Sequence, residues 1–144
     1  MLKRFIFIFL LFFPIAMSCA DQSSAVAVIV GNTSVLEKLT KPEIIEIYSG
    51  KNVTITGNIT PLPLDVNDPI LRAYFYKSLI GMSLPRLNSY WARLMFSGQS
   101  TPPRILPNEM FVINMVKNNP SAIGFVWKKT ADSSKSVKIL IILQ

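Results

Sequence analysis

Apolar residues along the chain fall into continuous runs and helically spaced sets that follow one another. A continuous run at residues 25–30, and runs interrupted by one residue each at 122–127 and 137–143, are typical of strands that are buried on both faces of a sheet. Helical spacing and start signals predict four helices, which begin at Thr40, Asp68, Ser83 and Asn108 and end near Gly50, Gly81, Ser97 and Lys117. The pattern therefore predicts one α/β domain with a sheet flanked by helices.

Three weaker segments complete this pattern. Residues 59–64 predict another strand, which Pro61 and Pro63 place at a sheet edge or make irregular. Residues 101–104 predict a loop, because Pro102 keeps the residue before it out of helical angles. Residues 130–136 predict a polar turn, short enough for the last two strands to form a hairpin. Such a hairpin would make the sheet mixed.

The first twenty residues have the pattern of an export signal. Lys3 and Arg4 precede an apolar run at residues 5–15, and small residues occupy the −3 and −1 positions of a cleavage site after Ala20. The run is shorter than the roughly 20 residues that span a bilayer. We therefore expect residues 1–20 to be a signal peptide and residues 21–144 to form a single domain in the periplasm.

Cys19 leaves a second use of this leader open, as the lipid-bearing residue of an anchored lipoprotein. Lipoprotein sites prefer a Leu-like residue three positions before the cysteine, where this chain has Ala16. We therefore favour export without a lipid. The segment after the leader contains no cysteine, which speaks for a bacterial periplasm rather than a small disulfide-stapled secreted domain.

Composition narrows the function classes. The chain has 15 Lys and Arg against 8 Asp and Glu, no His and one Cys. These counts exclude catalysis by a His-dependent triad or a Cys/His pair, and they exclude zinc held by His or Cys. No spacing of carboxylates suggests acid–base chemistry. Basic residues are scattered rather than gathered in a stripe, so nucleic acid is not an expected partner. We predict no enzyme, no metal site and no cofactor.

Two blocks of sequence resemble phosphate-type periplasmic solute-binding proteins. Residues 39–51, LTKPEIIEIYSGK, resemble the family's helix-then-glycine segment, and residues 119–126, NPSAIGFV, resemble its Ala-Ile-Gly strand entry. The resemblance extends over residues 25–143 and is greatest to a short, single-lobe form. It implies an exported protein of the phosphate ABC transporter substrate-binding type, which binds a small oxyanion and passes it to a membrane transporter.

The chain departs from that family at the anion loop. Family members carry an Arg-Ser-Asp-Gly-Ser-Gly-Thr type loop after the second strand, where this chain has residues 64–70, LDVNDPI. Asp65 matches the family's Asp, but the glycines and hydroxyls are absent. A second hypothesis therefore stays open: a ligand-free domain of the same fold that serves as an accessory or interaction protein of the cell envelope.

Six residues are the candidate ligand contacts. Asn32, Thr33 and Ser34 follow the first strand, where open α/β sheets place their ligand crevice. Arg104 follows two prolines and could be the charge partner of an oxyanion held by these hydroxyls. Asp65 and Asn67 lie in the loop that matches the family's anion loop. The competing interpretations are a polar turn with a helix cap, a solvated arginine and an Asx turn, respectively.

Overall fold

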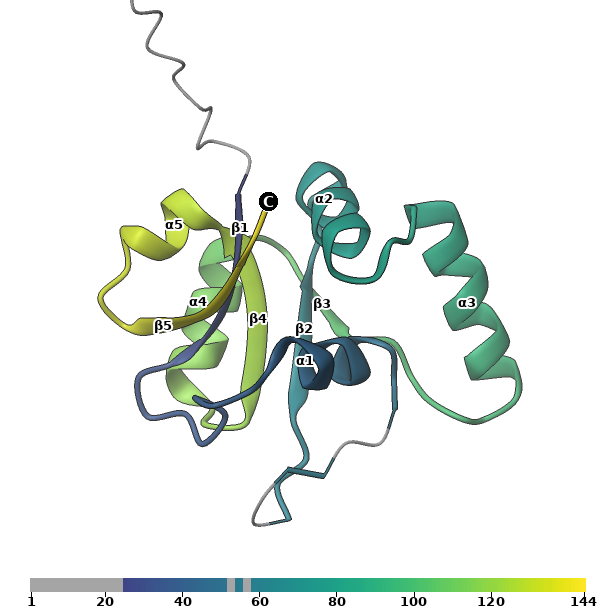
Figure 1. Cartoon of the computed structure of the whole chain (residues 1–144), viewed down its shortest axis with the longest axis horizontal. Helices are drawn as coiled ribbons and strands as arrows, with labels where there is room; N and C mark the ends of the chain where they lie inside the picture. Colours follow the sequence, from purple (N-terminus) through teal and green to yellow (C-terminus); the bar gives the residue numbers. More distant parts are fainter. Residues whose placement is uncertain (1–24, 52–53, 56–57) are drawn as a thin grey trace, which may run out of the picture.

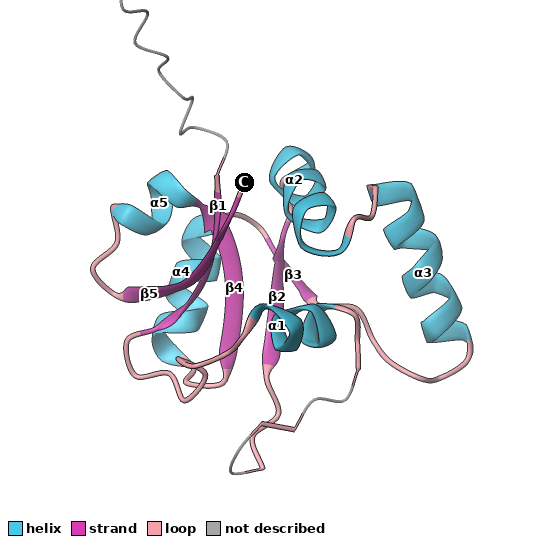
Figure 2. Ribbon diagram, in the orientation of Figure 1, coloured by secondary structure: helices cyan, strands magenta, loops and turns pink. Residues whose placement is uncertain are grey.

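The computed structural model describes residues 25–51, 54–55 and 58–144, and the predicted signal peptide and its cleavage site lie outside them. The elements follow one another as β1 (Val26–Gly31), α1 (Lys41–Tyr48), β2 (Leu62–Val66), α2 (Pro69–Ile80), α3 (Leu84–Phe96), β3 (Arg104–Leu106), α4 (Glu109–Asn118), β4 (Ala122–Trp127), α5 (Lys128–Asp132) and β5 (Val137–Leu143) (Figure 1). The predicted α/β fold with a sheet between helices is confirmed (Figure 2).

The sheet has five strands in the order β3-β2-β4-β1-β5. β2 is parallel to β3 and β4, whereas β1 is antiparallel to β4 and β5, so the predicted mixed sheet is confirmed. The predicted hairpin between the last two strands is wrong, because β1 lies between them. The predicted turn at residues 130–136 overlaps the end of α5, and this segment carries the chain past β1 to the edge position of β5.

Two further expectations are corrected around the prolines. β2 is not at an edge, because it lies between β3 and β4; its ladder with β4 is confined to Leu62 and Pro63, and its last residues pair with β3. The edge position belongs to β3, which begins at Arg104, where we predicted a loop. A strand of three residues carries too little pattern to be recognised in sequence.

Helices cover both faces of the sheet. On one face, Phe75 of α2 stacks on Phe125 of β4 with ring centroids 3.7 Å apart, and Tyr48 of α1 meets both rings edge-on. On the other face, a Cβ on Gly124 would lie 2.4 Å from Val112 of α4, so this helix packs directly on the backbone of β4. α3 lies outside α2, away from the sheet (Figure 1).

Local chemistry fixes the helix ends as predicted. Thr40 and Glu43 form a capping box at the start of α1. The Asp68 carboxylate accepts hydrogen bonds from the backbone N–H groups of Ile70 and Leu71 at the start of α2. Gly81 ends α2 in the left-handed region with φ of 70°. Within the described residues, no helix is both long and apolar enough to cross a membrane.

Candidate functional site

The six predicted contact residues lie at two opposite ends of the sheet. Because β1 is antiparallel to β2, β3 and β4, its carboxyl end meets their amino ends. Asn32, Thr33, Ser34 and Arg104 therefore lie at this amino end of the parallel strands. Asp65 and Asn67 lie at the carboxyl end of β2, and the structure does not bring them together with the other four.

The turn after β1 uses its polar groups to hold the fold. The Asn32 side chain donates to the Lys135 carbonyl at 2.8 Å. The Ser34 hydroxyl donates to the Pro120 carbonyl at 2.8 Å and accepts from the backbone N–H of Leu36 at 3.0 Å. Ser34 is buried, whereas Thr33 is exposed. These contacts connect the turn to the loops that precede β4 and β5, the two strands beside β1.

Arg104 is distant from that turn. It is exposed at the start of β3, and β2 and β4 lie between β3 and β1. Three strand spacings of about 4.8 Å separate the two strands by roughly 14 Å. The structure therefore does not place Arg104 against Thr33 and Ser34, as the sequence suggested, because strand order cannot be inferred from the spacing along the chain.

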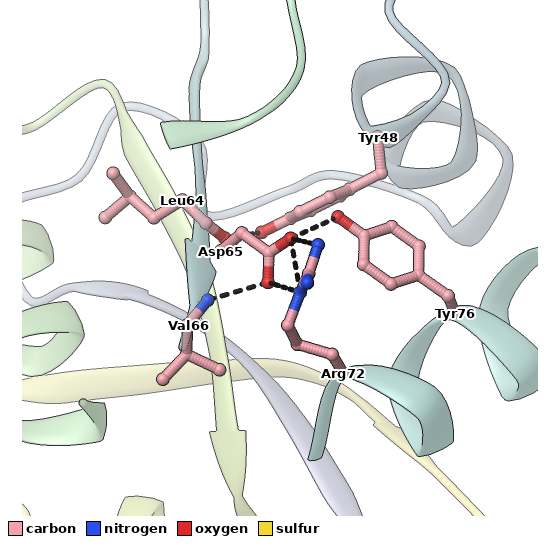
Figure 3. Close-up of polar contacts among 6 residues, drawn as sticks. All are labelled: Tyr48, Leu64, Asp65, Val66, Arg72 and Tyr76. Carbon is pink, nitrogen blue, oxygen red and sulfur yellow. Dashed lines mark hydrogen bonds and ion pairs between the residues drawn. The ribbon is translucent and has the colours of Figure 1, made fainter. Parts of the chain in front are cut away.

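Asp65 lies at the centre of a buried polar cluster (Figure 3). The Arg72 Nε lies 3.0 Å from each carboxylate oxygen, and its Nη2 lies 2.9 Å from Oδ2. The Tyr76 hydroxyl donates to Oδ2 at 3.0 Å, and the backbone N–H of Val66 donates to Oδ1 at 2.7 Å. The carboxylate thus accepts from four donors within the fold.

Burial sets the ionisation of this cluster. The side chain of Asp65 is only 2% exposed, and burial raises the pKa of its carboxyl, although Arg72 and the hydrogen bonds pull it down. Burial and the neighbouring Asp65 charge raise the pKa of the Tyr76 hydroxyl well above its usual value, so it donates as a neutral group. Sequence reasoning missed Arg72, which lies one turn into α2 and seven residues after Asp65.

A pocket of about 470 Å³ opens at the carboxyl end of β2, lined by residues 66–69, 107–110 and Thr130. We call it the carboxyl-end pocket. The first amides of both helices that reach it are occupied, those of α2 by Asp68 and those of α4 by Asn108. Two carboxylates, Asp68 and Glu109, line it without any Lys or Arg among its described lining residues. Its electrostatics oppose an anion.

A second pocket, of about 340 Å³, lies at the amino ends of β2 and β3. It is lined by Ile47, Gly50, Lys51 and residues 60–63 and 100–104. Its charged lining residues are Lys51 and Arg104, and hydroxyls come from Thr60, Ser100 and Thr101. We call it the Lys51–Arg104 pocket. Of the predicted contact residues it contains Arg104 alone. Lys51 stands out in the sequence only as part of the glycine-lysine motif and was not a predicted contact.

Three solved structures resemble the fold of this chain. An ABC-type phosphate transport receptor from Vibrio cholerae matches 81% of this chain with a TM-score of 0.56 and 18% identity. A possible phosphate binding protein from Planctomyces limnophilus DSM 3776 matches 81% with a TM-score of 0.57 and 13% identity. A candidate phosphate ABC transporter substrate-binding protein from Clostridium perfringens, solved with bound phosphate, matches 83% with a TM-score of 0.54 and 15% identity.

The fold is that of phosphate-type substrate-binding proteins. The resemblance noted in the sequence is thereby confirmed at the level of the fold. The chain spans between 40% and 54% of the length of these three proteins, which corresponds to a single small lobe. No protein-family model matches the sequence, and no curated protein is significantly similar to it.

Proposed function

We propose that this chain is an exported solute-binding protein of the phosphate ABC transporter substrate-binding type that binds a small oxyanion. The observation that carries the proposal is the combination of this fold with a pocket whose charged lining residues are both cations, Lys51 and Arg104. Without Lys3 and Arg4 of the leader, 13 Lys and Arg against 8 Asp and Glu leave a net charge of about +5, which favours an anionic ligand over a cationic one. The three structural neighbours are binding proteins, which favours binding over catalysis.

Export and delivery belong to the same proposal. The leader pattern of residues 1–20 supports passage into the periplasm, where a protein of this type would meet its solute. A membrane transporter is the partner that the fold suggests. One of the three neighbours is a phosphate transport receptor.

A second function is favoured by a different observation. At the carboxyl-end pocket, Asp68 and Asn108 occupy the helix amides that could otherwise bind an anion. Such a self-capped arrangement suits a domain that keeps the fold without a ligand there. On this alternative the chain is an accessory or interaction protein of the cell envelope.

Calorimetry on the processed protein separates the two functions. Titration with inorganic phosphate and with sulfate, at fixed ionic strength, should give saturable heat if the chain is an oxyanion binder. Sodium chloride at the same ionic strength is the control for screening of surface charge. If neither oxyanion gives heat at millimolar concentration, the binding function is wrong and the accessory function is favoured.

A further inference from the structure

We infer that the oxyanion is held in the Lys51–Arg104 pocket, at the amino ends of β2 and β3. This inference rests on the proposed function and adds a position and a ligand class to it. The ligand class is a tetrahedral oxyanion of phosphate or sulfate type. Three features of the molecule support this position: the rigid walls of the pocket, the charges that face it and the state of the helix end beside it.

Prolines and close packing hold the walls of the pocket. Pro61, Pro63, Pro102 and Pro103 line it, and each fixes its own φ angle. Gly50 adopts a φ of 71°, and a Cβ on it would lie 2.7 Å from the Ser100 hydroxyl oxygen. The end of α1 and the loop before β3 therefore meet at a fixed separation.

A further tie joins the same helix end to α3. The Tyr90 hydroxyl donates to the Ser49 carbonyl at 2.6 Å. The ring of Trp91 also packs against Gly50, so closely that a Cβ on this glycine would lie 2.6 Å from it. α3 thus fixes the position from which Lys51 extends. A pocket with preformed walls binds its ligand without the entropy cost of ordering a flexible loop.

Charge at the pocket matches a doubly charged oxyanion. The Arg104 guanidinium can donate two parallel hydrogen bonds to two oxygens, and the Lys51 ammonium supplies a second positive charge. Lys51 has a competing partner, Glu46, but their atoms are 3.5 Å apart and both side chains are largely exposed, at 68% and 44%. A surface pair of this kind is weak, so an oxyanion can displace the carboxylate.

The end of α1 does not oppose the ligand strongly. The last carbonyls of a helix carry partial negative charge, which would disfavour an anion. Here the carbonyls of Ile45, Glu46 and Ile47 accept hydrogen bonds from the N–H groups of residues 49, 50 and 51. The carboxyl-end pocket offers the opposite balance, with Asp68 and Glu109 on its lining. Of the two pockets, the Lys51–Arg104 pocket is the one whose charges attract an oxyanion.

Calorimetry with phosphate tests this position through matched charge removals. Arg104→Ala and Lys51→Ala should each weaken phosphate binding by about ten- to a hundredfold, since a charge-assisted hydrogen bond is lost. The affinity of Arg104→Lys for phosphate should lie between those of wild type and Arg104→Ala. Lysine keeps the positive charge but cannot donate two parallel hydrogen bonds in the way a guanidinium does. Lys117→Ala removes a charge of the same sign from the exposed side of α4, outside the lining of this pocket, and should leave the affinity unchanged.

The outcomes separate the position from the function. If wild type binds phosphate and neither Arg104→Ala nor Lys51→Ala changes the affinity, the position is wrong while the proposed function stands. If Lys117→Ala weakens binding as much as Arg104→Ala, phosphate responds to the overall positive charge rather than to this pocket, and the position is also wrong. If wild type binds neither phosphate nor sulfate, both fail. Melting temperatures without phosphate show whether each variant is folded, and Arg104 and Lys51 are exposed enough to be replaced without unfolding.

Discussion

Asp65 and Arg72 form a buried ion pair that we expect to matter for stability. Asp65 is almost fully enclosed, and the Arg72 side chain is 20% exposed. A buried pair contributes little compared with two apolar residues, but removing one partner leaves a charge without compensation. The cluster therefore fixes how α2 sits on β2.

Arg72→Ala should destabilise the protein by about 3–5 kcal/mol at neutral pH. Burial already raises the Asp65 pKa above its ordinary 3.8, and loss of Arg72 should raise it further. A carboxyl whose pKa is raised on folding favours the folded state below the unfolded pKa, and this contribution is lost as pH rises through the folded value. The penalty should thus shrink as the pH approaches about 4, the ordinary range of an Asp carboxyl. Urea unfolding across this pH range measures it.

Two controls belong with that experiment. Lys77→Ala removes a cation from the exposed side of the same helix and should change the free energy of unfolding by less than about 0.5 kcal/mol. Asp65→Asn should abolish the pH dependence that this carboxyl contributes. An equal loss for Arg72→Ala at every pH would mean that Arg72 acts through packing and not through its charge.

Tyr48 joins three elements through one hydroxyl. It is fully buried and shares its proton between the Leu64 carbonyl at 3.0 Å and the Ile123 carbonyl at 3.2 Å. Tyr48→Phe should cost about 1–3 kcal/mol, since buried carbonyls lose a donor. Thermal unfolding measures the loss. The matched control is Tyr74→Phe, because Tyr74 is only partly buried. Similar losses in both variants would contradict the role given to the Tyr48 hydroxyl.

At the scale of elements, glycine determines how closely α4 approaches the sheet. A Cβ on Gly31 would lie 2.1 Å from the Val116 carbonyl oxygen, which is helix backbone and cannot rotate away. A Cβ on Gly124 would meet the side chain of Val112 instead. Small residues on neighbouring strands thus allow one helix to rest directly on β1 and β4.

Gly31→Ala should therefore destabilise the protein at or above the upper end of the roughly 1–3 kcal/mol expected for overpacking. The matched control is Gly81→Ala, which adds the same methyl group in open space. The φ of 70° at Gly81 still imposes a backbone cost of about 1–2 kcal/mol. Denaturant unfolding of both variants gives the comparison. A smaller loss for Gly31→Ala would show that α4 can move away from β1 easily.

Elements with strong start and stop signals could be predicted from the sequence, and the rest could not. α1, α2 and α4 have Thr40, Asp68 and Asn108 at their starts, and their predicted bounds agree closely with the structure. α5 has Trp127 at its start with no capping side chain, so nothing distinguishes it from a turn. Pairing partners are non-local, which is why the sequence left open whether β2 was irregular or at an edge and wrongly paired β5 with β4.

At the scale of the whole molecule, strand order decides which candidate residues can share a site. Arg104 and the Asn32–Ser34 turn are at the same end of the sheet, yet β2 and β4 separate them. Lys51 and Arg104 are far apart in sequence and line one pocket. The sequence could identify Arg104 as a candidate cation for an oxyanion. It could not identify Lys51 as the second cation of the same pocket, because that depends on how α1 packs beside the loop before β3. The sequence could predict which types of residue would contribute to a site, but not which of these residues would lie together.

The leader should determine where the full chain goes in a bacterial host. The described sheet begins at Val26, so cleavage after Ala20 would leave β1 intact. We expect a periplasmic protein with Asp21 at its amino terminus, without lipid, as measured by mass spectrometry of the periplasmic fraction. Ala20→Leu should block this cleavage, because the −1 position requires a small residue.

Cys19→Ser distinguishes export from anchoring. If signal cleavage follows Ala20, the Ser variant should be processed like wild type, since serine is also small and position 19 is not one of the two recognised positions. A lipoprotein instead needs the Cys19 thiol for its lipid, so the same substitution would stop maturation. An acylated Cys19 at the amino terminus of the wild-type protein would therefore overturn the soluble form. The Lys51–Arg104 pocket would then belong to a protein tethered to the membrane surface.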